Sequence, residues 1–155
     1  MSNIPETPYG QYEFFLKNSS DHLFPASVEL GCRDWNDNRG RHTDCRILMK
    51  WANGEIECMD WHFFGALKLI RRQLALQDIY PICYGANRNI IVTGMALEMG
   101  LGLKVYKAKI GSYPTRHDLV RIFATGEDVE PVTVEIQEEF QRQWVESINR
   151  NQGMG

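Results

Sequence analysis

The residues best suited to chemistry form a short polar loop, Tyr84-Gly-Ala-Asn-Arg-Asn89. The loop follows the apolar segment 80–84, which is typical of a short buried strand, and ligands often contact the loops at the carboxyl ends of strands. Its amide and guanidinium groups can donate hydrogen bonds to a phosphate or a carboxylate. One hypothesis is therefore an anion-binding loop. Its candidate ligand-binding residues are Tyr84, Asn87, Arg88 and Asn89.

The glycines around this loop do not complete a nucleotide-binding motif. Residues 85–102 contain four glycines, but these do not form G-x-G-x-x-G, and no P-loop lysine follows them. Glycines also allow tight turns and close packing, which is the interpretation that we favour. The hypothesis of a small-molecule-binding or enzymatic domain thus depends on the loop itself and on Met95 nearby.

Two other clusters combine residue types used in catalysis or metal binding. His42 and Asp44 lie in an arginine-rich segment that would suit an acid–base pair or an anion site, but a solvated, charged turn is the more ordinary explanation. Cys58, Asp60 and His62 alternate along the chain, as ligands on one face of a strand would. A helix that begins near His62, with Asp60 as its cap, would break that alignment, and we favour this alternative.

Signatures of metals, cofactors and catalysis are missing from the sequence. The cysteines at 32, 45, 58 and 83 include no C-x-x-C pair, which argues against structural zinc. No G-x-S-x-G, H-E-x-x-H or paired-carboxylate motif occurs. We therefore expect no metal, no cofactor and no catalytic residue, and we favour a binding protein over an enzyme.

Targeting signals are also missing. The first ten residues are polar and contain proline, unlike a signal peptide, and no apolar run approaches the roughly 20 residues that span a bilayer. We expect four reduced thiols, a cytoplasmic location and no membrane contact. The net charge of −3, from 20 acidic and 17 basic residues, argues against a nucleic-acid partner.

Charge is unevenly distributed along the chain. Residues 86–121 carry six basic and two acidic side chains, whereas residues 127–146 carry seven acidic side chains and one basic. Acidic residues favour helix N-termini, which explains part of the second segment. Alternatively, this segment forms a surface that steers a basic partner protein. The residues expected to contact such a partner are Glu135, Glu138, Glu139 and Arg142.

A β-hairpin is the clearest local structure in the sequence. Asn53-Gly54 favours a two-residue type I′ turn within residues 44–61. That turn would pair Trp51 with Ile56 and would place apolar side chains together on one face. Residues 25–33 are expected to form a third strand, with a charged loop over 34–44 between them.

The rest of the chain alternates between expected helices and short strands. Apolar spacing predicts helices over 62–77, 93–100, 116–124 and 133–148, and strands over 80–84 and 103–110. In the last helix, the expected buried stripe is Ile136, Phe140, Trp144 and Ile148. The predicted fold is α+β, an antiparallel or mixed sheet with an N-terminal β-meander or hairpin and three to four packed helices. We expect one domain over 1–155, with flexible ends at 1–8 and 149–155.

The segment 80–145 carries a recognisable pattern, YGA-R…GM…GLK-Y…DVEPVTV, which begins at Tyr84. It resembles a family of small, mostly uncharacterised bacterial proteins that is associated with toxin immunity. The resemblance implies a bacterial cytoplasmic protein that neutralises a cognate toxin by occluding its active site. It supplies no set of functional residues. A self-associating structural or regulatory subunit remains a third possibility, and the sequence leaves the oligomeric state open.

Overall fold

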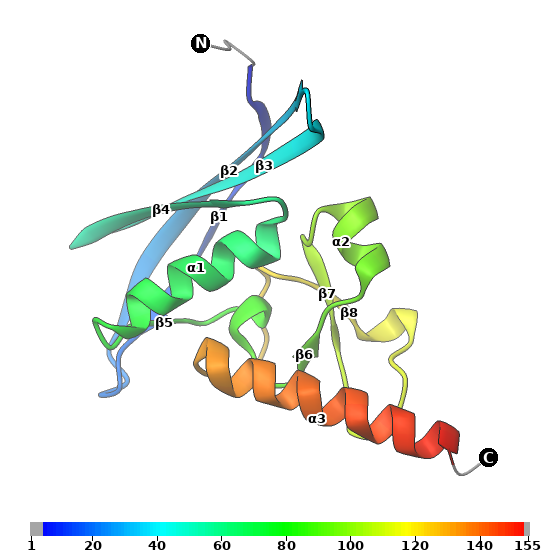
Figure 1. Cartoon of the computed structure of the whole chain (residues 1–155). Coiled ribbons are helices and arrows are strands. Elements are labelled where there is room, and N and C mark those ends of the chain that lie inside the picture. The colour runs from blue at the N-terminus through cyan, green and yellow to red at the C-terminus, as the bar shows by residue number, and fades with distance from the viewer. Residues whose placement is uncertain (1–4, 154–155) are drawn as a thin grey trace.

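The first half of the chain folds as an antiparallel β-meander. The computed structural model describes residues 5–153. Four long strands follow one another, and a short fifth strand joins the free side of the first, in the order β4-β3-β2-β1-β5 (Figure 1). The strands are β1 (Thr7–Lys17), β2 (Leu23–Asp37), β3 (Gly40–Trp51), β4 (Gly54–Asp60) and β5 (Tyr80–Pro81). The meander arises because buried apolar residues alternate with exposed ones along each long strand.

The β3–β4 hairpin has the predicted position, but the predicted register is wrong. Trp51 pairs with Gly54 rather than with Ile56, and the later pairs are shifted likewise by two residues. Neither Asn53 nor Gly54 has the positive φ that a type I′ turn requires. Gly54 instead lies against the Trp51 indole, where a Cβ atom would come within 2.5 Å of Cζ2. Because the shift is an even number of residues, the apolar face is preserved.

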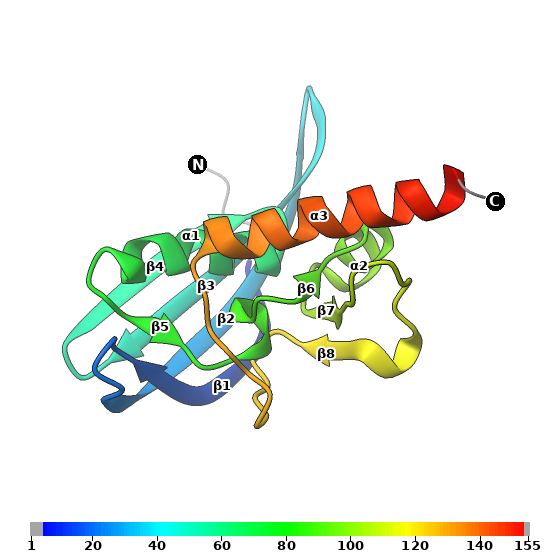
Figure 2. The ribbon, with the colours of Figure 1, turned by 90° about the horizontal axis from the view of Figure 1, so that it is seen from below.

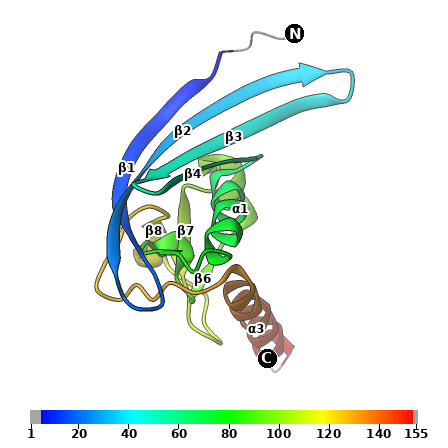
Figure 3. The same ribbon diagram turned by 90° about the vertical axis from the view of Figure 1, so that its left-hand side faces the viewer.

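Residues 34–44, predicted as a loop, instead continue β2 and β3 as a two-stranded arm beyond the sheet (Figure 3). β1 begins opposite Cys32, and β4 ends opposite Cys45, so neither strand flanks the arm. The rings of Trp35 and His42 face each other across the arm and stack at 4.2 Å. Such cross-strand pairs stabilise a ribbon even where the composition resembles that of a loop.

Helix α1 (Phe63–Ala75) packs against the inner face of the curved sheet (Figure 3). Its apolar stripe confirms the prediction, since the side chains that fall at helical spacing are buried. The core between the sheet and α1 includes Leu16, Leu30, Ile47, Met49, Phe63, Phe64, Leu67, Ile70 and Leu74.

A second, three-stranded antiparallel sheet lies beside α1 in the order β6-β7-β8, with β6 (Ile90–Ile91), β7 (Lys104–Lys107) and β8 (Leu119–Arg121). Helix α2 (Gly94–Gly100) connects β6 to β7 and confirms the helix predicted there, with Thr93 as its N-cap. The helix predicted over 116–124 is wrong. A capping box at Thr115 closes one 3₁₀ turn, and the chain then continues as β8. The strand forms because Leu119, Val120 and Arg121 pair with Tyr106, Val105 and Lys104 of β7, a contact that the local cap signal does not show.

Helix α3 (Val134–Gly153) packs against α1 and β6, below both in the view of Figure 1, and it runs in front of α1 in Figure 2. Of the predicted stripe, Ile148 is buried and Phe140 and Trp144 are half-buried, but the prediction for Ile136 is wrong, because it is 41% exposed whereas Gln137 is 2% exposed. Both ends of the chain were expected to be flexible. Instead, Thr7–Pro8 belong to β1 and residues 149–153 belong to α3, whereas residues 1–4 and 154–155 lie outside the described ones. The predicted α+β class with an N-terminal meander is confirmed. None of the helices within residues 5–153 is both long and apolar enough to cross a membrane.

Candidate functional site

The loop Tyr84–Asn89 uses its polar groups inside the protein. Tyr84 begins a 3₁₀ turn, and its hydroxyl donates to Asp128 Oδ1 at 2.6 Å. Asn87 is 4% exposed. Its Oδ1 accepts a hydrogen bond from the Glu130 main chain at 2.6 Å, and its Nδ2 donates to Asn89 Oδ1 at 2.5 Å. Of the four candidate ligand-binding side chains, Arg88 alone is exposed. These contacts favour a structural role for the loop over anion binding.

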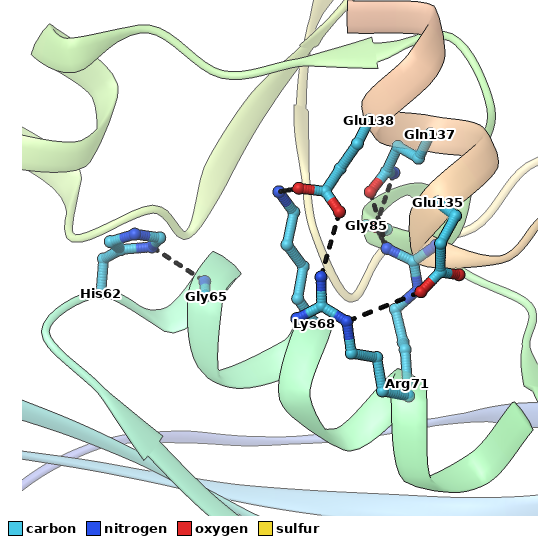
Figure 4. A network of polar contacts seen from close by, with 9 residues as sticks. His62, Gly65, Lys68, Arg71, Gly85, Glu135, Gln137 and Glu138 are labelled. Atoms are coloured by element: carbon cyan, nitrogen blue, oxygen red, sulfur yellow. Dashed lines mark hydrogen bonds and ion pairs between the residues drawn. The ribbon is translucent and has the colours of Figure 1, made fainter. Parts of the chain in front are cut away.

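Arg71 of α1 is the buried centre of a network that joins this loop to α3 (Figure 4). Arg71 is 3% exposed. Its Nη1 donates to Gly85 O at 3.0 Å and to Gln137 Oε1 at 2.7 Å, and its Nη2 donates to Val132 O at 2.8 Å. Within residues 5–153, its Nε has no hydrogen-bond partner. Burial lowers the pKa of Arg71 to about 10, so the guanidinium stays charged at neutral pH.

Gln137 completes the network from the side of α3. Its Nε2 donates to Gly85 O at 3.0 Å and to Asn87 O at 2.7 Å. Neither Arg71 nor Gln137 was among the functional residues predicted from the sequence. The only sequence signal is their position, because Arg71 follows buried Leu67 by one helical turn and Gln137 stands at a core-facing position of α3. Their partners lie 14 to 66 residues away in the chain, which no local pattern reveals.

Two of the four expected contact residues on α3 pair with α1 (Figure 4). Glu138 lies 3.0 Å from Arg72 and 3.8 Å from Lys68, and Glu135 lies 3.8 Å from Arg72. Burial lowers the pKa of Lys68, and Glu138 opposes that shift. Glu138 therefore serves the α1–α3 contact, whereas the Glu135 side chain is 72% exposed and remains accessible.

The outward side of α3 carries a charged surface, the α3 ridge, which consists of Glu135, Glu139, Arg142 and Glu146. These positions recur every three or four residues and so lie on one side of the helix. Arg142 Nε donates to Glu139 Oε2 at 2.8 Å and Nη1 donates to Glu146 Oε1 at 2.5 Å. The pKa of Glu139 is lowered, mainly by its hydrogen bonds with Arg142. Glu139 and Glu146 flank Arg142, and Glu135 lies one turn before Glu139 and 3.8 Å from Arg72 of α1, so the ridge itself carries three acidic groups and one basic group.

The C-terminal half of α3 is attached to the segment after β7 by three hydrogen bonds. Trp144 Nε1 donates to Ser112 O, Ser147 Oγ accepts from Gly111 N, and Asn151 Nδ2 donates to Gly111 O, each at 2.8 Å. Trp144 is half-buried, which agrees with a packing role. Contacts at both halves of α3 therefore hold the ridge in a defined position.

The structure does not bring Cys58, Asp60 and His62 together as a metal or catalytic set. Cys58 accepts a hydrogen bond from Gln73, and Asp60 accepts one from the main chain of the next residue. His62 is the N-cap of α1, because its Nδ1 accepts from Gly65 N at 2.8 Å, so the prediction that Asp60 caps the helix is wrong. In the part of the chain that the structure describes, no group of three His, Cys, Asp or Glu residues could hold a metal ion.

His42 and Asp44, which lie on the arm, do not form the acid–base pair considered from the sequence. His42 Nε2 lies 2.8 Å from Asp37 Oδ1 rather than next to Asp44. Asp44 accepts a hydrogen bond from Trp35 Nε1 at 2.8 Å. The pKa of Asp37 is lowered, first by its hydrogen bond with His42. These contacts link the two strands of the arm, which is a structural use of both carboxylates.

Protein-family models and curated proteins provide no relative of this chain. No protein-family model matches the chain. No curated protein matches it at a significant level. The resemblance to a bacterial family associated with toxin immunity therefore stays a prediction. A function can be inferred only from the surfaces of this chain.

Proposed function

We propose that this protein is a bacterial cytoplasmic binding protein of the immunity type, which neutralises a toxin by covering its active site with the α3 ridge. The observation that supports this most is the fixed, exposed and acidic outward side of α3. Three of the four residues expected from the sequence to contact a partner, Glu135, Glu139 and Arg142, lie on this ridge. The fourth, Glu138, faces α1 instead.

The ridge has the properties of a prearranged electrostatic surface. Arg142 bridges Glu139 and Glu146, which fixes two carboxylates that lie about two turns apart on the helix. Side chains that are already ordered lose less conformational entropy on binding. Carboxylates exposed on one side of a helix also accelerate encounter with a basic protein. Such a partner would carry a basic groove, as enzymes that cleave nucleic acids do, because their substrates are polyanions.

Apolar side chains border the ridge and would complete the interface. Ile136 is 41% exposed and Val145 is 42% exposed. In protein interfaces, apolar contacts add affinity, whereas charged groups set the association rate and the choice of partner. The proposed interface combines the two, because aliphatic side chains lie on both sides of the charged ridge.

The proposal is tested by co-expression with the product of the adjacent gene. We expect that product to be toxic alone, to be harmless in the presence of this protein, and to elute with it as one complex. Replacing Glu139 and Glu146 together by glutamine should lower the association rate at low salt by about tenfold. The matched control replaces Glu127 and Glu130, two exposed acids before α3, by glutamine and should change that rate little.

Two results would contradict the proposal. The first is an adjacent product that is harmless alone, or that still kills cells when this protein is present. The second is an equal effect of the two glutamine pairs on the association rate, which would exclude the α3 ridge as the contact surface. Thermal unfolding of each variant shows whether a lost interaction reflects lost folding.

A further inference from the structure

A second surface, formed by residues other than the α3 ridge, lies between α2 and the second sheet. It is an open groove of about 430 Å³. Its lining residues come from α2, from β7 and β8, and from the start of β1. The residues that matter for its chemistry are Tyr9, Met95, Met99, Leu103, Tyr106 and Leu119. None of the residues 84–89 lines it, so the loop and Met95 do not form one site.

Helix α2 presents its methionines to solvent instead of packing them into the core. Met95 is 70% exposed and Met99 is 81% exposed, and none of the seven residues of the helix is buried. The helix is nevertheless well terminated, because the Thr93 side chain caps its N-terminus and Leu101 adopts a left-handed conformation at its end. Methionine is flexible and polarisable, and it recurs on surfaces that bind apolar side chains of varied shape.

Two exposed cations, Lys104 and Arg121, lie beside the groove. Lys104 of β7 is directly opposite Arg121 of β8, and Tyr106 is directly opposite Leu119 two residues further on. Alternation along the strands therefore places all four on the groove side of the sheet. Both cations are exposed, and within residues 5–153 neither makes an ion pair, although many other cations of the chain do.

A second, smaller apolar pocket adjoins the groove. It has a volume of about 160 Å³ and shares Leu103 and Lys104 with the groove, and Tyr12, Arg121 and Phe123 complete it. The two hollows therefore meet at Leu103 and Lys104, and Arg121 borders the second one. An occupant that enters both hollows would suit this surface if it carried a negative charge between two apolar groups.

We propose that this surface binds a short amphipathic segment of a partner protein, with an acidic side chain between apolar anchors. Lys104 and Arg121 would pair with the carboxylate, and Met95 and Met99 would cover the anchor in the groove. A segment laid into a groove by its apolar side is a common mode of peptide recognition. The proposal is independent of the α3 ridge, whose negative charge suits a partner of the opposite sign.

The test uses a random peptide library displayed on phage and selected on the immobilised full chain. Recovered peptides should contain Asp or Glu flanked by large apolar residues. When such a peptide is synthesised and titrated into the labelled protein, the backbone amide NMR signals of residues 93–106 and 119–121 should shift. Replacing Lys104 and Arg121 together by glutamate should weaken its binding by about tenfold, since two ion pairs become repulsive.

Two matched variants complete the experiment. Replacing Arg88 and Lys109, two exposed cations outside the groove, by glutamate changes the net charge equally and should leave the affinity within about twofold. Replacing Met95 and Met99 by alanine should weaken binding without unfolding the protein, because both side chains are exposed.

Several results would overturn the proposal. Recovered peptides that are basic or uncharged would contradict the predicted chemistry, and so would equal effects of the two glutamate pairs. Self-association that is lost with the Lys104 and Arg121 changes would show that a second copy of this chain occupies the surface. Failure of the α3 ridge variants in the toxin assay would leave this proposal unaffected, because they change different residues.

Discussion

Replacing Gln137 by leucine tests whether the buried network truly holds α3 in place. Gln137 joins α3 to Arg71 on α1 and to the carbonyl groups of Gly85 and Asn87. Leucine is similar in size but has no polar atoms, so the change removes the hydrogen bonds while it keeps the volume filled. The expected result is a protein that folds but is clearly less stable.

The size of the effect follows from the three hydrogen bonds that are lost. A bond to a charged group contributes about 1.5–3 kcal/mol and a neutral one about 0.5–1.5 kcal/mol. Gly85 O keeps Arg71 as a donor, whereas Asn87 O loses its side-chain donor. Burial of the apolar leucine side chain offsets part of this loss in the free energy of unfolding. We expect a net loss of about 3 kcal/mol, which corresponds to a fall in Tm of roughly 6–12 °C for a chain of this length.

The assay is urea unfolding at neutral pH, followed by circular dichroism. Gln141→Leu is the matched control, because Gln141 is half-buried one turn further along α3 and takes part in none of these bonds. Its unfolding midpoint should stay close to that of the unchanged protein. A double-mutant cycle with Arg71→Met should give a coupling energy above about 1 kcal/mol, since the two side chains are in direct contact.

Equal unfolding midpoints for Gln137→Leu and Gln141→Leu would refute this reasoning. It would mean that the network contributes no more than ordinary packing. A coupling energy near zero would separately show that Arg71 is stabilised by the carbonyl groups alone. A change in the slope of the transition would indicate an altered unfolded state, and the comparison would then be repeated by thermal unfolding.

Four further predictions concern stability and thiol reactivity. Gly54→Ala should destabilise the protein by about 1–3 kcal/mol, because the new Cβ atom would clash with the facing indole. Gly100→Ala, in α2 with open space around it, should be neutral or stabilising by about 0.5–1 kcal/mol. Burial lowers the pKa of His62 in the folded protein. On acidification, the unfolded state therefore protonates His62 at a higher pH than the folded state does. The free energy of unfolding should fall as the pH drops below the ordinary value of 6.5. Burial raises the pKa of all four thiols, and half-buried Cys58 should react first with Ellman's reagent.

The outcomes that would contradict these predictions are equally specific. Equal unfolding midpoints for the two alanine variants would exclude the clash at the hairpin. His62→Asn keeps an N-cap oxygen but does not titrate, so an undiminished loss of stability on acidification in this variant would rule out His62 as the cause. Rapid labelling of more than one thiol before unfolding would show that the buried cysteines are accessible in the native state.

Periodicity in the sequence predicted much of the fold, but it failed where contacts across the chain compete with local preference. The apolar stripe of α1 and the alternation in the meander were correct, because a helix or strand must bury one side. The hairpin register was wrong, since Trp51 packs on Gly54 and so moves the turn. The arm at 34–44 was missed because the stacking of Trp35 on His42 is a cross-strand contact that composition does not show.

The candidate surfaces divide in the same way. The sequence by itself determined the α+β class, the acidic segment and its place on a helix, because these depend on residue types at fixed local spacing. Only the tertiary structure decided which acids pair with α1, and that Tyr84 and Asn87 of the loop are buried whereas Arg88 is exposed. The physical reason is that Arg71, Gln137 and the loop come from three separate parts of the chain. A buried polar group must find its partners wherever the fold places them.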